Sequence, residues 1–250
     1  MWMKPALFLG LLALGLLSSL SALAADRVVL ASLEWPPYTG ESLPGNGATS
    51  EVVREAFRVM GYELEIRFYP WNRALNEARL DKDIAGYFPE YPEHWHKDAF
   101  LNSDSVGSSS LGLASRQEMV INWQTLDDLR RYTLGVVAGY ANTPEFDAMA
   151  KEGRLTIDHS STDALNLRKV LAGRVRAAVV DTNVFRHLLQ VDPVLRKQRG
   201  ELVMSTRLLG TNSLVVCFSD TERGRRLGRI LNLGLRQVDQ EAVYLRHFKE

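Results

Sequence analysis

Apolar and polar residues follow two different patterns along this chain, one typical of strands and one typical of helices. Residues 28–33 form an apolar run, and residues 63–69 alternate apolar and polar side chains, as half-buried strands do. Between these strands, residues 50–60 place their apolar side chains with the period of a helix. A second helix is predicted over residues 72–80 and a third strand over residues 84–88. The first part of the chain therefore predicts one β-α-β-α-β unit.

The same order of elements returns later in the chain. Residues 133–137, 155–157 and 177–181 have the composition of short strands, and helices are predicted over residues 143–152 and 162–172. A second β-α-β-α-β unit follows from this pattern. Two such units predict an α/β protein with two lobes.

The remaining segments connect these two units. Residues 100–104 and 108–115 are predicted to be extended chain that leaves the first unit, and residues 213–218 to be a strand that returns to it. Helices over residues 222–238 and 241–248 are expected to end the chain.

Local signals indicate where individual helices begin and end. We expect Thr49 or Ser50 to be the N-cap of the first helix and Gly61 to end it in the left-handed conformation. In the second unit, Thr143 followed by Pro144 predicts a helix start. Free backbone N–H groups at such a start bind anionic groups.

The N-terminal residues have the organisation of a signal peptide. Lys4 supplies the positive charge, residues 6–20 the apolar stretch, and Ala22 and Ala24 the small residues of a cleavage site. We expect cleavage after Ala24 and removal of residues 1–24, with an uncleaved anchor as the alternative. The mature protein is then exported and soluble.

Charge and cysteine content limit the partners of the chain. Its 250 residues include 30 basic and 30 acidic side chains, so the formal net charge of zero gives no reason to expect nucleic acid as a partner. Cys217 is the only cysteine, which excludes an intramolecular disulfide. It lies in an apolar run and is expected to be a buried strand residue. No cysteine follows the cleavage site, so no lipid anchor is expected.

Several short motifs stand in a fixed order along these elements. They are Trp-Pro-Pro-Tyr at 35–38, Gly61, Leu-Asp-Asp-Leu at 126–129, Leu-Gly-Val-Val-Ala-Gly at 134–139, Leu-Ala-Gly-Arg-Val at 171–175 and Val-Val-Asp at 179–181. In this order the chain resembles the bacterial family-3 extracellular solute-binding proteins, which include the polar amino acid receptors of ABC transporters. The resemblance covers essentially the whole mature chain.

The resemblance implies a two-lobed periplasmic binding protein fold of type II, joined by a two-stranded hinge and closing on its ligand. One lobe would contain residues 26–112 and 212–250, and the other residues 113–211. The resemblance also implies a monomeric periplasmic protein that delivers a small polar solute to an inner-membrane ABC permease. No cofactor and no catalytic residue are expected.

Candidate ligand-binding residues come from the segments that end the predicted strands. They are Tyr38, Trp71, Arg73, Tyr87, His94, Gly139, Tyr140, Asn142, Thr143 and Asp181. By resemblance, Tyr38 would stack on the ligand, and Asp181 would accept its ammonium group. Each has an alternative: Tyr38 packs under its own loop, and Asp181 caps the turn that follows it.

Three further points concern the ligand's charge. By resemblance, the loop over residues 139–143 would meet the ligand's carboxylate. Arg73 could pair with an anion from the cleft wall, or could be an exposed residue of an ordinary helix. Amino acid receptors of the family usually carry an Arg after the third strand; here His94 stands about there, which puts an amino acid ligand in doubt. His94 and His96 are too few to predict a metal site.

Two other functions remain open from the sequence. A few proteins of this fold are lyases, such as periplasmic cyclohexadienyl dehydratase, and Glu34, Glu90, Glu93 or Asp181 could then be the general acid. The third possibility is a ligand sensor that reports to a membrane signalling protein.

Overall fold

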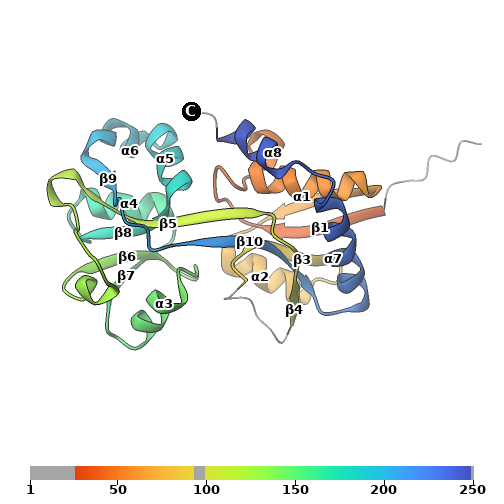
Figure 1. Cartoon of the computed structure of the whole chain (residues 1–250), viewed down its shortest axis with the longest axis horizontal. Helices are drawn as coiled ribbons and strands as arrows, with labels where there is room; N and C mark the ends of the chain where they lie inside the picture. The colour runs from red at the N-terminus through yellow and green to blue at the C-terminus, as the bar shows by residue number, and fades with distance from the viewer. Residues whose placement is uncertain (1–25, 93–98, 249–250) are drawn as a thin grey trace, which may run out of the picture.

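The structure, a computed structural model, describes residues 26–92 and 99–248. Figure 1 shows two groups of elements side by side, joined by two long strands that run between them. The predicted signal peptide and His94 lie outside the described residues. None of the helices in the described ranges is long and apolar enough to cross a membrane.

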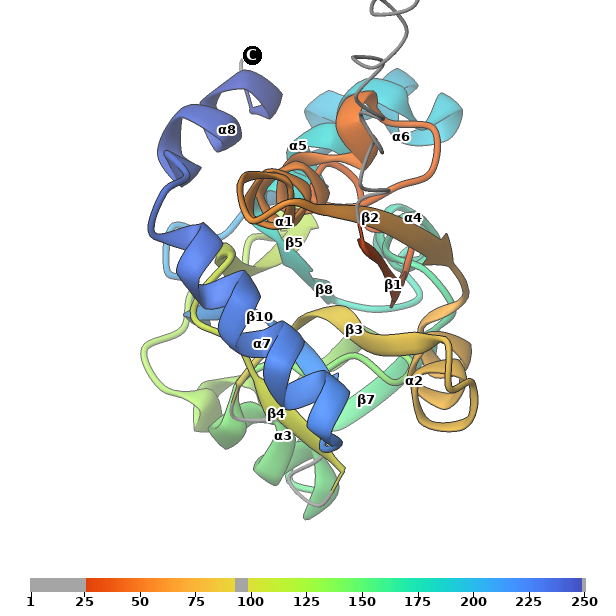
Figure 2. The same ribbon diagram turned by 90° about the vertical axis from the view of Figure 1, so that its right-hand side faces the viewer.

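The first lobe is built on a parallel β-α-β-α-β unit. Its elements are β1 (Asp26–Ser32), α1 (Ala48–Val59), β2 (Tyr62–Phe68), α2 (Trp71–Leu80), β3 (Ile84–Glu90), β4 (Phe100–Asn102), α7 (Glu222–Leu235) and α8 (Gln240–His247). Strands β2, β1 and β3 lie in that order and pair in parallel. Helices α7 and α8 pack beside α1, as Figure 2 shows from the side of this lobe.

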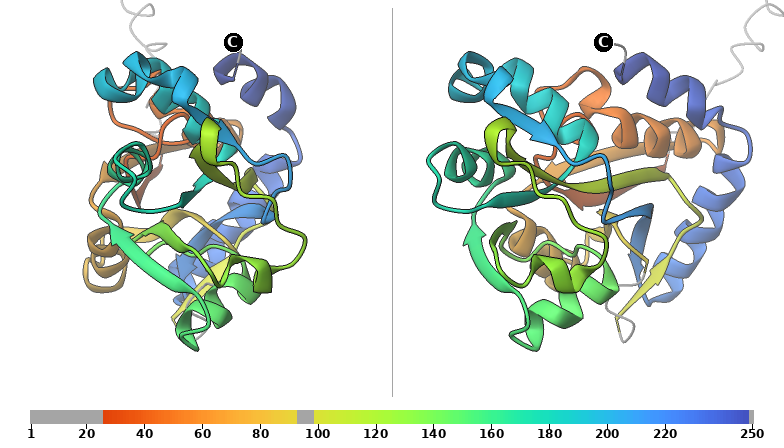
Figure 3. Two further views of the ribbon diagram at one scale, coloured as in Figure 1. Left: turned by 90° about the vertical axis from the view of Figure 1, so that its left-hand side faces the viewer. Right: turned by 60° about the vertical axis from the view of Figure 1, so that its left-hand side comes forward.

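The second lobe repeats the same topology. Its elements are β6 (Thr133–Val137), α3 (Pro144–Lys151), β7 (Thr156–Ser160), α4 (Asp163–Leu171), β8 (Ala177–Asp181), α5 (Thr182–Val191), α6 (Pro193–Lys197) and β9 (Leu202–Met204). Strands β7, β6 and β8 lie in that order, again in parallel. Helices α4, α5 and α6 gather on one side of these strands and α3 lies on the other (Figure 3).

Two antiparallel strands connect the lobes. Strand β5 (Gly107–Arg116) and strand β10 (Gly210–Ser219) pair with each other, with Leu111 opposite Gly210. Strand β5 continues beside β8 of the second lobe, and β10 continues beside β3 of the first. The predicted two-stranded hinge is therefore confirmed. The division of the chain into lobes at residues 112/113 and 211/212 stays a prediction.

Alternating side chains of the central strands separate the cores on the two faces of each sheet. Val28 and Leu30 of β1 pack with the buried face of α1, whereas Val29 and Ala31 pack with α2. This arrangement follows from the period of two in a strand, because neighbouring side chains point to opposite faces. Cys217 belongs to the α2 side and is fully buried, as expected.

The helix ends are mostly those expected from local sequence. Gly61 has a φ of 81°, the left-handed conformation predicted for the end of α1. Thr143 is the N-cap of α3 and accepts a hydrogen bond from the Phe146 amide. The N-cap predicted for α1 is wrong: Gly47 takes that place, because the helix begins at Ala48, two residues before the predicted range of 50–60.

Candidate functional site

The carboxyl ends of the parallel strands of both lobes face one another and enclose a cavity. The inner part has a volume of about 40 Å³, and an adjoining open groove has about 680 Å³. The inner cavity is lined by Leu33, Trp35, Trp71, Pro89, Glu90, Tyr91, Tyr140, Ala141 and Leu214. Most of these residues lie at the carboxyl end of a strand or within four residues after it, the usual place for a ligand in an open α/β sheet.

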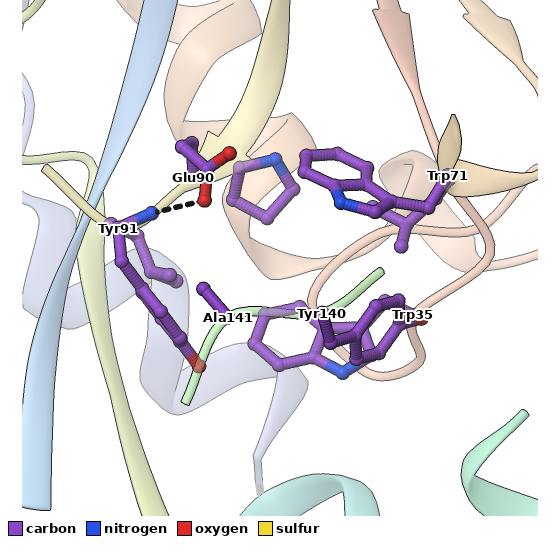
Figure 4. Close-up of a pocket in the computed structure, with 9 residues that line it drawn as sticks. Trp35, Trp71, Glu90, Tyr91, Tyr140 and Ala141 are labelled. Atoms are coloured by element: carbon purple, nitrogen blue, oxygen red, sulfur yellow. Dashed lines mark hydrogen bonds between the residues drawn. The ribbon is translucent and has the colours of Figure 1, made fainter. Parts of the chain in front are cut away.

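Aromatic rings from both lobes form the walls of the inner cavity (Figure 4). Trp35 follows β1 and Trp71 begins α2, while Tyr140 comes from the loop after β6. Trp35 stacks on Tyr38 with a centroid distance of 4.4 Å, and Trp71 meets Tyr87 edge to face at 5.6 Å. These contacts behind the wall fix the orientation of both tryptophan rings.

One carboxyl group, that of Glu90, faces this aromatic cavity. Glu90 ends β3 and is 8% exposed; its Oε1 accepts a hydrogen bond of 2.9 Å from the Tyr91 amide. Burial raises the pKa of Glu90 to about 7, and the Tyr91 amide and the nearby Tyr87 hydroxyl offset only part of this rise. The Tyr87 hydroxyl is itself buried and forms no well-formed hydrogen bond with the residues that the structure describes.

A second buried carboxyl group lines the open groove. Asp163 begins α4 and is 9% exposed, and no side chain in the described part of the chain forms a hydrogen bond or ion pair with it. Burial, together with the charge of Asp181, raises its pKa to about 7. The cavity and its groove therefore contain two buried carboxyl groups that lack a cationic partner among the described residues.

Asp181, the predicted acceptor of a ligand's ammonium group, caps a helix in this structure. Its Oδ1 accepts hydrogen bonds of 2.7 and 3.0 Å from the amides of Asn183 and Val184 at the start of α5. The sequence pattern did not predict α5, and the capping alternative considered for Asp181 is what this structure contains.

The other carboxylate oxygen of Asp181 is held by the first lobe and the hinge. Oδ2 accepts hydrogen bonds of 3.0 Å from the Tyr38 hydroxyl, 2.8 Å from the Ser109 hydroxyl and 2.9 Å from the Ser110 amide. A carboxylate has about four lone-pair positions, so these donors and the helix cap fill them. With 1% exposure, Asp181 has no surface left for a ligand in this structure.

Tyr38 lies behind the cavity wall and not in it. Its side chain has no exposed surface, because Trp35 covers one ring face and Phe248 meets the ring edge to face at 5.3 Å. Its hydroxyl donates to Asp181 and accepts from the Asn183 amide group at 2.9 Å. Trp35 occupies the wall position that the sequence analysis gave to Tyr38.

The loop from Gly139 to Thr143 lies against the first lobe, but the amides of its Asn142 already have partners. Asn142 donates from its backbone and side-chain amides to the two oxygens of Asp147, at 2.9 and 2.7 Å. Its carbonyl accepts a hydrogen bond of 3.0 Å from the hinge residue Asn212. The anion at this helix start is therefore a side chain of the protein itself.

Arg73 and Tyr87 lie away from the cavity surface. The Arg73 side chain is 64% exposed and pairs with Glu77 at 3.1 Å, which is the alternative of an ordinary helix residue. Tyr87 is fully buried behind Trp71. Among the candidates, the structure brings Trp71 and Tyr140 together at the cavity.

The charged side chains among the described residues that line the cavity and groove are all acidic. Both lobes contribute acids, namely Glu34, Glu41, Glu90 and Asp163. None of the described residues that line either space is Lys, Arg or His. An arrangement of this kind attracts cations and repels anions.

Sequence reasoning missed Trp35 and Asp163 as lining residues and considered Glu90 only as a general acid. The signal for these residues was their position in the sequence: Glu90 ends a strand, and Trp35 and Asp163 each lie three residues after the end of one. The predicted third strand, residues 84–88, ends before Glu90, whereas β3 continues to this residue.

Comparisons with known proteins support the fold. No family model matches the chain, and no curated protein sequence matches it. A histidine kinase sensor domain with similarity to periplasmic binding proteins is 17% identical, with a TM-score of 0.71 over 89% of this chain and 95% of that chain. The substrate-binding protein of an amino acid ABC transporter is 16% identical, with a TM-score of 0.67 over 89% and 97%.

A third solved structure is the ancestral amino acid-binding protein AncCDT-1, a precursor of cyclohexadienyl dehydratase. It is 16% identical, with a TM-score of 0.68 over 90% of this chain and 96% of that chain. At these identities the likeness defines the fold. The two-lobed periplasmic binding protein fold expected from the sequence is therefore confirmed.

Proposed function

We propose that this protein is a periplasmic solute-binding protein that captures a small polar solute between its lobes and releases it unchanged to an inner-membrane ABC permease. The observation that carries the proposal is the cavity itself. Trp35, Trp71 and Glu90 of one lobe converge there with Tyr140 of the other. A mostly apolar cavity with a few convergent polar groups is the usual form of a small-molecule site.

A ligand screen on the mature chain, residues 25–250, tests this function. Thermal unfolding is measured with amino acids, amines, dicarboxylates and small anions. A ligand at a hundredfold excess over its Kd stabilises the folded state by about 2.7 kcal/mol, which gives a clear shift of Tm. We expect calorimetry to give one site per chain and the ligand to be recovered chemically unchanged. The absence of any stabilising solute across all four classes would refute the proposal.

Glu90 supports a second candidate function, that of a lyase. A carboxyl group whose pKa is about 7 is suited to general acid catalysis near neutral pH, and Glu90 faces the cavity. Prephenate, however, carries two carboxylates, and the described lining offers them no cation. Product formation from prephenate or arogenate that Glu90→Gln abolishes would favour the lyase over the receptor.

A sensor role predicts the same cavity and the same ligand. It differs only in the membrane partner, a signalling protein in place of a permease. Cross-linking of the ligand-loaded protein to a purified permease, compared with the ligand-free protein, would separate the two roles.

A further inference from the structure

From the sequence, we expect an α-amino acid to be bound by three groups. In this chain each of them is either already hydrogen-bonded within the protein or absent. Asp181 is saturated by donors from Tyr38, the hinge and α5. The loop before α3 gives its Asn142 amides to Asp147. The sequence between β3 and β5, residues 91–106, contains no Arg, and Arg73 is exposed and paired with Glu77. None of these groups is available for a ligand's ammonium or carboxylate group.

The described side chains that do face the cavity are aromatic, acidic or apolar. Figure 4 shows Trp35, Trp71 and Tyr140 around the inner cavity, with the Glu90 carboxyl group at one side. Within the described part of the chain, only Oε1 of this carboxyl has a well-formed hydrogen bond, although the side chain is more than nine-tenths buried. Aromatic faces attract ammonium groups through the negative potential of the ring, and a carboxylate adds direct charge attraction.

The cost of burying charge favours the same ligand. A buried carboxylate without a partner is unfavourable in water-poor surroundings, so it either keeps its proton or binds a cation. No Lys, Arg or His among the described lining residues can supply that cation. A ligand carboxylate in the same space would find no cation and would face Glu90.

We infer that the cavity binds an organic ammonium ion without a carboxylate group, with its charged nitrogen between the aromatic walls and against Glu90. The inference rests on the proposed solute-binding function and names the class of solute. The inner cavity of about 40 Å³ has room for only a small head group. The rest of the ligand would extend into the groove of about 680 Å³, where Asp163 can accept a second amine.

Binding of such a cation would depend on pH through Glu90. Among the described residues, the titratable groups that face it are Tyr87 on β3, Tyr91 after β3, Cys217 on β10 and Tyr140 from the other lobe. Burial raises the pKa of each of these tyrosine and cysteine side chains above its usual value, so all four stay neutral near pH 7. With a Glu90 pKa of about 7, the ionised fraction, and with it the affinity for a cation, rises about tenfold between pH 6 and 8.

Amino acids and their decarboxylated amines provide a matched test. Calorimetric titration of the mature chain compares L-lysine with cadaverine, L-ornithine with putrescine and L-arginine with agmatine, and choline serves as a quaternary ammonium ion. Each pair differs by one carboxylate. We expect at least one amine to bind at least about tenfold more tightly than its parent amino acid, the effect of one unpaired charged group.

Variants connect this difference to the cavity. Glu90→Gln keeps the shape of the side chain and removes its charge, so we expect about tenfold weaker amine binding and a smaller dependence on pH. Trp71→Leu removes one aromatic face and is expected to weaken choline most. Glu63→Gln removes an exposed acid on β2 and serves as the control, with unchanged affinity. Circular dichroism verifies that each variant is folded.

The outcomes separate this inference from the function on which it rests. Equal or tighter binding of the amino acids overturns the inference and leaves a solute-binding protein. Amine binding that Glu90→Gln does not change also overturns it, because the cation then lies elsewhere. If no amine binds while an anion from the wider screen does, the inference is wrong and the receptor function stands. Only failure of the entire screen removes both.

Discussion

The hydrogen bond between Tyr38 and Asp181 joins the two lobes through single side chains. The donor, Tyr38, lies in the loop after β1 of the first lobe, and the acceptor, Asp181, is the N-cap of α5 in the second. Ser109 of β5 donates to the same carboxylate oxygen, so the hinge takes part as well. Burial raises the pKa of Asp181, and these donors oppose that rise. The residues expected to hold a ligand thus hold the lobes together.

Tyr38→Phe tests this contact, because it removes the hydroxyl and keeps the ring that packs on Trp35. Loss of a buried hydrogen bond to a charged acceptor should lower the free energy of unfolding by about 2 kcal/mol. Urea denaturation measures the change. Tyr62→Phe is the matched control, since the Tyr62 hydroxyl has no hydrogen bond within the described residues. An equal loss in both variants would show that the Tyr38 hydroxyl contributes nothing specific.

Close packing between two helices explains why a glycine, Gly234, stands within α7, where helix propensity would favour another residue. Gly234 lies near the end of α7, where α7 crosses α1. A Cβ at this position would come within 1.9 Å of the Ala56 carbonyl oxygen. Backbone that approaches so closely leaves no space for a side chain, although glycine weakens an isolated helix.

Gly234→Ala therefore has two opposite expectations. Helix propensity alone predicts a gain of about 1 kcal/mol, whereas the clash predicts a loss of at least about 2 kcal/mol. We expect the loss, measured as a lower midpoint of urea unfolding. Gly228→Ala in the same helix is the control, because its Cβ would meet only the Phe218 ring at 3.3 Å. Its stability should change by less than about 1 kcal/mol, and a stabilised Gly234→Ala would contradict the packing argument.

The molecule as a whole keeps two carboxyl groups in unfavourable surroundings at its centre. Glu90 and Asp163 lie in different lobes, and burial raises the pKa of each to about 7. In the unfolded chain such groups release their protons near pH 4. Between about pH 4 and 7 the folded state therefore binds more protons, and the free energy of unfolding falls as the pH rises through this window.

Glu90→Gln should reduce this loss of stability. Without ligand, we expect the variant to be more stable than the original protein at pH 8, by at most about 3 kcal/mol, and to differ little near pH 4. Urea denaturation at several pH values measures the difference. Glu63→Gln, which replaces an exposed acid, is the control: its free energy of unfolding should depend on pH in the same way as that of the original protein. Parallel profiles for Glu90→Gln as well would mean that Glu90 is not held protonated in the folded protein.

The sequence alone determined the elements whose signal is local. Strands over residues 133–137 and 177–181 were predicted with the bounds they have, because short β-branched runs between turns leave little choice. Thr143 with Pro144 fixed the start of α3, and Gly61 the end of α1, since caps depend on the conformation of one or two residues. The repeated β-α-β-α-β order was sufficient for the two-lobed fold.

Only the tertiary structure decided which of the residues at the strand ends face the cavity. Trp35 and Tyr38 belong to one turn, yet one ring lines the cavity and the other is buried beneath it. Asp181 had the expected position, but donors from three separate segments filled its oxygens. Such contacts join residues more than seventy positions apart, as between Ser109 and Asp181. The order of residues fixes local conformation, whereas the partners of a buried polar group depend on how distant segments pack.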